Sequence, residues 1–107
     1  MPVAKLEAFP PQVVALSQFA RALSHPARIA IITYLHKRGE CPCMDIVNSL
    51  PLSQPACSRH VNALRKAGLL RSKARGSVIL FSLDHTKIRR FCDAFGSAMK
   101  PPTSAAR

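Results

Sequence analysis

The sequence predicts a mainly α-helical domain with a small β-hairpin, arranged as about five helices plus two strands. Apolar residues recur at helical spacing in five segments that are separated by proline, glycine or capping residues. After residue 68 the pattern changes to the alternation typical of strands. With 107 residues, the chain is long enough for one domain and too short for two with proper cores.

The first two helices are predicted from their prolines and apolar stripes. Pro10 and Pro11 suit the start of a first helix, because the first helical turn tolerates proline. Its predicted stripe comprises Val13, Val14, Leu16, Ala20 and Leu23. Pro26 then starts a second helix, which ends in a basic turn and Gly39. The residues expected to face inward are Ile29, Ile32 and Leu35.

A short third helix and a longer fourth one follow on either side of a tight turn. The third is expected to start near Pro42 and to end at Pro51. Ser53 is a good N-cap for the fourth helix, and Gly68 is its predicted end. The apolar positions of the fourth helix are Cys57, Val61 and Leu64. Its opposite face carries Gln54, Ser58, Arg59, Asn62, Arg65 and Lys66.

The segment "LLRSKARGSVILFSL" predicts two strands around a turn at Arg75, Gly76 and Ser77. Ile79, Phe81 and Leu83 alternate as its expected inward face. Asp84 can cap a fifth helix with one apolar stripe, formed by Ile88, Phe91, Cys92, Phe95 and Met99. A domain this small has little left to cover that stripe, so we expect a partner subunit there.

The domain boundaries follow from this pattern. Residues 1–9 are expected to form a flexible arm, residues 10–99 the folded domain and residues 100–107 a disordered tail. The sequence shows neither a signal peptide nor an apolar run long enough for a membrane span, so we expect a cytoplasmic protein.

The charge of the chain indicates a polyanionic partner. Sixteen Lys and Arg against five Asp and Glu give a formal net charge of +11. Nucleic acid is the first candidate for this partner, and a membrane surface is the second. The alternative is a basic surface that keeps the protein soluble and binds no partner. From Gln54 to Leu83 the chain has six Lys or Arg residues and no acidic residue. The positive charge is therefore local, which favours a specific surface.

The third helix, the turn and the fourth helix form a helix-turn-helix pattern, and the hairpin that follows makes it a winged one. Such a second helix can lie in the major groove, where Gln54 can pair with adenine and Arg59 with guanine. Lys73 and Arg75, at or near the hairpin tip, are expected to contact phosphates or a flanking minor groove.

Three segments, "ALSHPARIAIITYL", "LSQPACSRHVNALRKAGLL" and "RGSVILFSL", resemble the ArsR/SmtB family of bacterial repressors in order and spacing. The resemblance covers roughly residues 16 to 90. It implies a homodimeric winged-helix protein that dimerises through its first and last helices and binds a palindromic operator. It also implies release of that operator by a metal, a metalloid or an oxidant, with no cofactor needed for DNA binding.

The resemblance carries DNA-contacting roles onto Ser53, Gln54, Ser58 and Arg59, with His60 beside them. Ser53 has the alternative of a pure helix cap, and His60 that of a packing partner. Arg65 and Lys66 are expected to contact phosphates, with an ordinary solvated face as their alternative.

The stretch "GECPCMDI" is the candidate sensor. Many arsenic and metal sensors of the family have a Cys-x-Cys pair at the start of the third helix, which Cys41 and Cys43 resemble. They lie one residue earlier than the family's cysteines, and Met44 occupies the second cysteine position. Arsenite needs a third ligand, for which Cys92, His36 or a residue of the other subunit are candidates. A redox or persulfide response and incidental thiols are the alternatives.

Two further sites are not predicted. The family's zinc site joins an Asp and a His at the start of the last helix to a His and a Glu near its end. Asp84 and His85 match the first two ligands, but Ser97 and Lys100 stand at the positions of the other two. The chain also shows no nucleophile with a base, no paired carboxylates and no phosphate-cradling loop, so an enzyme is not expected. The alternative function from a different class is that of a winged helix that binds RNA or another protein. Cys57 is expected to be core packing.

Overall fold

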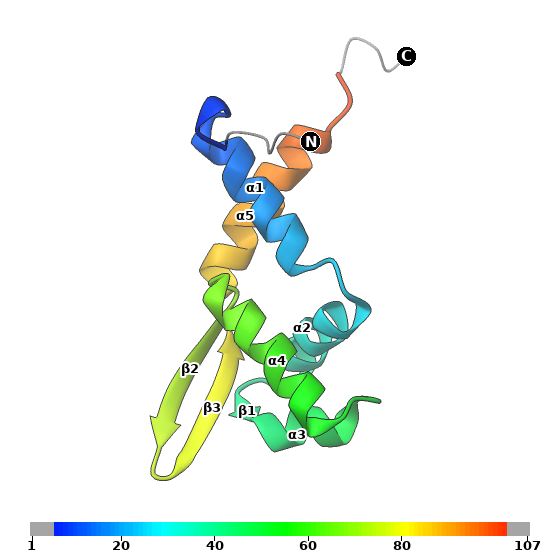
Figure 1. Cartoon of the computed structure of the whole chain (residues 1–107), viewed down its shortest axis with the longest axis vertical. Coiled ribbons are helices and arrows are strands. Elements are labelled where there is room, and N and C mark those ends of the chain that lie inside the picture. Colours follow the sequence, from blue (N-terminus) through cyan, green and yellow to red (C-terminus); the bar gives the residue numbers. More distant parts are fainter. Residues whose placement is uncertain (1–5, 103–107) are drawn as a thin grey trace.

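The computed structural model describes residues 6–102, which form five α-helices and a three-stranded antiparallel sheet (Figure 1). In chain order the elements are η1 (Leu6–Ala8), α1 (Pro11–Ala22), α2 (Pro26–Arg38), β1 (Cys41–Pro42), α3 (Cys43–Ser49), α4 (Gln54–Lys66), β2 (Leu70–Arg75), β3 (Val78–Leu83) and α5 (His85–Met99). The five predicted helices and the hairpin are confirmed, and the short elements η1 and β1 are additions. The predictions of a flexible arm and a disordered tail fall partly on residues 1–5 and 103–107, which lie outside the described residues.

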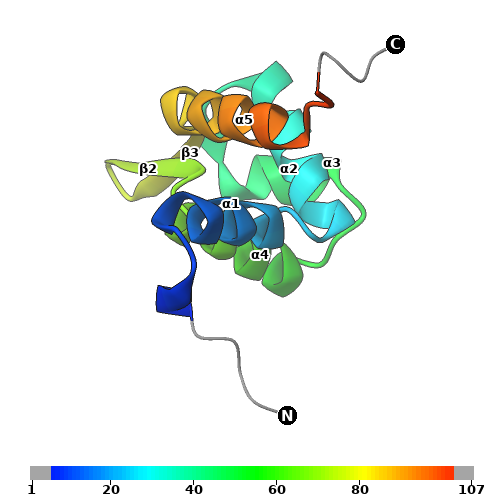
Figure 2. The ribbon, with the colours of Figure 1, turned by 90° about the horizontal axis from the view of Figure 1, so that it is seen from above.

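Helices α1 and α5 lie side by side at one end of the molecule, as both views show (Figures 1 and 2). Phe19 of α1 stacks on Phe91 of α5 with 4.8 Å between ring centroids. The buried residues of α1 are Phe19 and Ala22, whereas Val13 is exposed. The predicted stripe of α1 is therefore only partly correct, because Val13 and Ala20 are exposed while Val14, Leu16 and Leu23 are half-buried.

The core lies among α2, α3, α4 and the base of the hairpin. Its fully buried side chains are Ile31, Cys41, Ile46, Cys57, Val61, Leu64 and Leu69. The prediction for α2 is partly wrong, since Ile29 is exposed and Ile31 is buried in its place. Four apolar residues follow one another from Ile29 to Ile32, so the sequence permits several faces and the packing against α4 selects one.

The two ends of α4 are fixed by local interactions. The Ser53 hydroxyl accepts a hydrogen bond from the Ala56 N–H at 3.3 Å, which confirms the predicted cap. At the other end, Gly68 adopts φ +84°, a backbone conformation that favours glycine, and the Leu69 N–H donates to the Leu64 carbonyl at 3.0 Å. These caps set where the helix begins and ends relative to the core.

The sheet has the order β1-β3-β2, and β2 and β3 form a hairpin with a turn at residues 76–77. The predicted inward face is only partly correct. Leu83 is buried and Phe81 half-buried, but Ile79 is 48% exposed and Leu80 is buried instead. The hairpin projects away from the helices (Figure 1), so the core covers its base and leaves its tip exposed.

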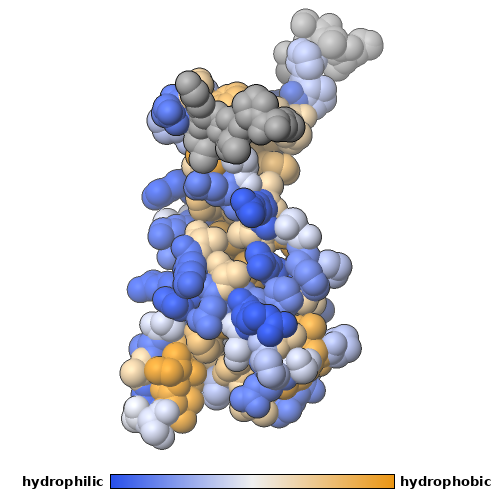
Figure 3. Space-filling view, in the orientation of Figure 1, coloured by the Kyte–Doolittle hydropathy of each residue, from blue (hydrophilic) through white to orange (hydrophobic). Residues whose placement is uncertain are grey.

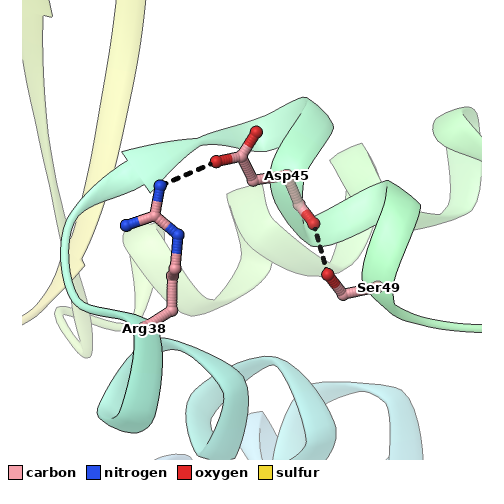
Figure 4. Close-up of polar contacts among 3 residues, drawn as sticks. All are labelled: Arg38, Asp45 and Ser49. Carbon is pink, nitrogen blue, oxygen red and sulfur yellow. Dashed lines mark hydrogen bonds and ion pairs between the residues drawn. The ribbon is translucent and has the colours of Figure 1, made fainter.

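An ion pair joins the end of α2 to the first turn of α3 (Figure 4). Arg38 donates through Nη2 to Asp45 Oδ2 at 3.0 Å, and Ser49 Oγ donates to the Asp45 carbonyl at 2.8 Å. Both charged side chains are more than a third exposed, so screening by solvent leaves the pair little effect on stability. Its main effect is to orient the start of α3. None of the described helices has the length and apolar content to cross a membrane.

Candidate nucleic-acid interface

The outward face of α4 is polar and basic. Gln54, Arg59, Asn62, Arg65 and Lys66 are exposed, and Ser58 is half-buried. Hydrophilic side chains cover this face of the molecule in the space-filling view (Figure 3). Within residues 6–102, the cations of α4 have no ion-pair partner. Their charge is therefore available to an external anion.

The amino-terminal end of α4 presents two of the predicted contact residues. Gln54 is the first residue of the helix and is exposed, and Ser53 precedes it. The Ser53 hydroxyl caps the helix, which is the alternative to a base contact that was considered for this residue. In helix-turn-helix proteins this end of the second helix meets base edges.

His60 is half-buried and faces the start of α2. Its Nδ1 accepts a hydrogen bond from Arg28 Nε at 3.1 Å, and its ring lies 4.3 Å from that of His25 between centroids. Arg28 also donates to the Ala22 carbonyl at 3.2 Å, while His25 Nδ1 accepts from the Ala27 N–H at 3.0 Å. This arrangement supports the alternative that His60 packs against α2 and does not contact DNA.

The Arg28 contact ties α4 to the start of α2 and to the end of α1. Burial lowers the pKa of His60, and the nearby charges of His25, Arg28 and Arg59 lower it further. The role of Arg28 could not be predicted from the sequence, because 32 residues separate it from His60 and no local pattern signals the contact.

The hairpin presents a basic and partly apolar tip. Arg75 pairs with Val78 next to the turn, so its predicted place at or near the hairpin tip is confirmed. Lys73 lies opposite Leu80, two residues before the tip, and its ammonium is 3.5 Å from the Glu40 carboxylate. Val78 and Ile79 are exposed and form an apolar patch that is visible at the tip (Figure 3).

The structure separates the four cysteines, all of which are free. Cys41 is buried in β1, Cys43 is half-buried at the start of α3, Cys57 is buried in α4 and Cys92 is exposed on α5. Burial raises the pKa of Cys41. Among the described residues, no three His, Cys, Asp or Glu side chains group as a metal site, so Cys92 does not complete one with Cys41 and Cys43.

Cys57 is buried in the core, as predicted, whereas no sequence pattern indicates its neighbour Cys43. Cys43, at the start of α3, is the thiol that acts on Cys57. Burial, reinforced by Cys43, raises the pKa of Cys57 to about 11. The two cysteines belong to different helices, so only the packing of α3 on α4 brings them together.

The helix pair α3–α4 with its basic outer face, followed by the hairpin, defines a winged helix-turn-helix domain of the DNA-binding class. Comparison with known proteins agrees with this class. A helix-turn-helix domain family matches residues 23–73. The transcriptional repressor SmtB of Mycobacterium tuberculosis is 33% identical over 92 residues, which cover 83% of this chain and 67% of that protein.

Other known proteins match a shorter part of the sequence or have a similar fold. The arsenical resistance operon repressor of Escherichia coli is 33% identical over 66 residues, covering 62% of this chain and 56% of that protein. The solved structure of an ArsR-like transcriptional regulator from Rhodococcus has a TM-score of 0.74 at 25% identity and covers 83% of each chain. NolR from Sinorhizobium fredii shares the fold, with a TM-score of 0.68 at 22% identity over 95% of this chain and 99% of that chain.

The chain belongs to the ArsR/SmtB family of helix-turn-helix transcriptional repressors. The family resemblance and the winged-helix fold predicted from the sequence are thereby confirmed. These relatives are transcriptional regulators, so the prediction that the chain is not an enzyme is confirmed as well.

The His60 cluster predicts a pH-dependent stability. His60 has a pKa below its ordinary value of 6.5 in the fold, so the unfolded chain binds more protons as the pH falls through 6.5. The free energy of unfolding therefore decreases on acidification. Between about pH 7.5 and about pH 5.5, which bracket the ordinary histidine pKa, we expect a smaller decrease for His60→Asn than for the parent, because asparagine cannot take up the proton.

Urea unfolding at both pH values and one protein concentration measures this difference. The introduced asparagine offers its Oδ1 as an acceptor to Arg28, so the variant keeps a hydrogen-bonding group at this position. His85→Asn, at the start of α5, is the control and should retain the parental decrease. Equal decreases in the parent and in His60→Asn would contradict the prediction.

Proposed function

We propose that the chain acts as a homodimer that binds a palindromic operator, with α4 in the major groove and the hairpin on the flanking backbone. One observation carries this proposal: α4 buries Cys57, Val61 and Leu64 while its opposite face exposes amide and guanidinium groups without an acidic neighbour. Such a face matches the chemistry of base edges and phosphates.

The residues of α4 take different roles in this arrangement. Gln54, Ser58 and Arg59 contact bases, while Arg65 and Lys66 contact phosphates. Ser53 fixes the end of the helix that enters the groove. His60, through Arg28, holds α4 against α2 and positions the contact residues. Arg75 and Lys73 contact the backbone beside the groove, and Lys73 must then exchange Glu40 for a phosphate.

The apolar surface of α1 and α5 supports dimerisation through these helices. None of the fifteen residues of α5 is buried in the single chain. Phe95 and Met99 of α5 and Val13 of α1 are exposed. A second copy of the chain would cover this surface, and a two-fold pair would match a palindrome.

The inducer is a soft metal or metalloid that binds thiols at the start of α3. Cys43 is the accessible thiol of this segment, and Cys41 lies two residues before it. Two relatives carry names that refer to arsenic resistance, which supports this class of inducer. DNA binding itself needs no cofactor.

Removal of the Arg59 guanidinium should reduce sequence discrimination. Arg59→Ala is expected to lose about 1–3 kcal/mol of preference for the operator over random duplex, because a bidentate contact to guanine is lost. Competition binding with both duplexes measures this difference. Lys66→Ala is the matched control and should weaken both duplexes alike. Full preference in Arg59→Ala would remove this residue from the base contacts.

Removal of the hairpin cations should weaken binding to every duplex. Lys73→Ala with Arg75→Ala is expected to flatten the salt dependence of log K by about one unit for each lost phosphate contact. The control Lys37→Ala with Lys100→Ala removes the same charge from exposed positions on or after other helices. If both double variants change the slope equally, net charge and not hairpin contact is responsible.

Removal of the thiols at the start of α3 should uncouple DNA binding from induction. Cys41→Ser with Cys43→Ser is expected to bind the operator and to stay bound when arsenite or cadmium is added. Titration of the reduced protein on its own promoter DNA measures this response. Release of the parent by peroxide or persulfide, and not by metals, would instead favour the redox alternative. Normal induction of the double variant would contradict the assignment of these cysteines.

A further inference from the structure

A hollow opens to solvent between α4 and the hairpin. Its volume is about 350 Å³, within the range of about 300–1,000 Å³ that is usual for small-molecule sites. On α4 it is lined by Ser58, Val61, Asn62 and Arg65. The last three follow Ser58 by three, four and seven residues, so all of them lie on one stripe of the helix. One side of the hollow is therefore a continuous strip of α4.

One face of the hairpin forms the opposite side. Ser72, Ile79 and Phe81 line the hollow. Ser72 pairs with Phe81 across the two strands, and Ile79 lies two residues from Phe81 in β3, so the three residues share a face. Lys73 and Arg75 alternate with this set along β2 and belong to the other face. The hollow is therefore distinct from the surface that carries the hairpin cations.

The wall of the hollow combines apolar side chains with one cation. Val61 is buried, Phe81 is half-buried, and Ile79 is 48% exposed and belongs to the apolar patch at the hairpin tip (Figure 3). Among the described residues that line the hollow, Arg65 is the only charged one. It is exposed and forms no ion pair within residues 6–102. The wall therefore offers both apolar surface and an uncompensated positive charge.

We propose that this hollow binds a small amphipathic monoanion, a carboxylate attached to an aromatic or branched hydrocarbon body. The carboxylate pairs with the Arg65 guanidinium and accepts a hydrogen bond from the Asn62 amide. The hydrocarbon body covers Val61, Ile79 and Phe81, and this removes apolar surface from water. A phosphodiester would bring the charge but no apolar body, and a neutral hydrocarbon would leave the guanidinium without a partner.

The effect of this ligand on transcription rests on the proposed function, whereas its binding does not. In the proposed complex with DNA, Ser58 contacts a base and Arg65 a phosphate. A ligand in the hollow occupies both side chains, so it and the operator exclude each other. The hollow thereby provides a second means of release, separate from the thiols at the start of α3. It acts by occupying the contact residues and needs no movement of the helices.

The probe 2-naphthoate tests the binding, with its neutral amide as the matched control ligand. Each is titrated calorimetrically into the full chain without DNA, and amide NMR spectra locate the site. We expect one 2-naphthoate per chain, with shifts in residues 58–65 and 72–81. The amide should bind about tenfold more weakly, because it lacks the charge that pairs with Arg65. Equal affinities of the acid and the amide, or shifts confined to α1 and α5, would overturn the proposal.

Single variants at exposed positions identify the contacts without disturbing the core. Arg65→Gln and Ile79→Ser should each weaken 2-naphthoate binding about tenfold, through loss of the charge and of the apolar surface. Lys66→Gln and Val78→Ser are the matched controls, because these exposed neighbours do not line the hollow, and both should retain the affinity. Retained affinity in Arg65→Gln and Ile79→Ser, or an equal loss in the controls, would contradict the assignment.

Competition with DNA separates the site from the proposed function. In the parent, 2-naphthoate should raise the apparent Kd for operator DNA, and in Ile79→Ser this effect should be weakened. Simultaneous binding of the ligand and the operator would overturn the exclusion. A chain that binds 2-naphthoate in the hollow but not the operator would contradict the proposed function and support the site. Normal operator binding without any binding of 2-naphthoate would overturn the site alone.

Discussion

The burial of one face of α4 is the constraint on which the rest of the structure depends. Cys57, Val61 and Leu64 are almost completely excluded from solvent, and their spacing of four and three residues places them on one side of the helix. This burial fixes the rotation of α4 about its axis, so the opposite side must present Arg59 and Lys66. The same contact that stabilises the core therefore orients the DNA-contacting face.

The size of the domain imposes a second constraint. The core is filled by α2, α3, α4 and the base of the hairpin, and α1 and α5 share only a small contact centred on Phe19 and Phe91. Helix α5 is left without a buried residue. The surface that a single chain leaves uncovered is thus the surface through which we propose that two chains associate, and the proposed DNA-contacting face belongs to another helix, α4.

The sequence predicted features that depend on local chemistry and failed where distant contacts decide. The cap at Ser53, the stop at Gly68 and the buried positions of α4 follow from residues within one or two turns, and all are confirmed. Ile29 and Ile79 were placed wrongly, because packing against other elements selects among adjacent apolar residues. The neighbourhood of Cys43 and Cys57 could not be predicted, since it depends on the angle between two helices.

The proposed inducer site lies at the start of α3, which packs directly against α4, so no long pathway separates it from the proposed DNA contacts. A ligand shifts a conformational equilibrium only by the difference between its affinities for the two states. The proposed ion at the start of α3 therefore releases the operator only if it binds an open arrangement of α3 and α4 better than a closed one. If DNA holds the closed arrangement, the coupling is reciprocal, and operator DNA must weaken ion binding by the factor by which the ion weakens operator binding.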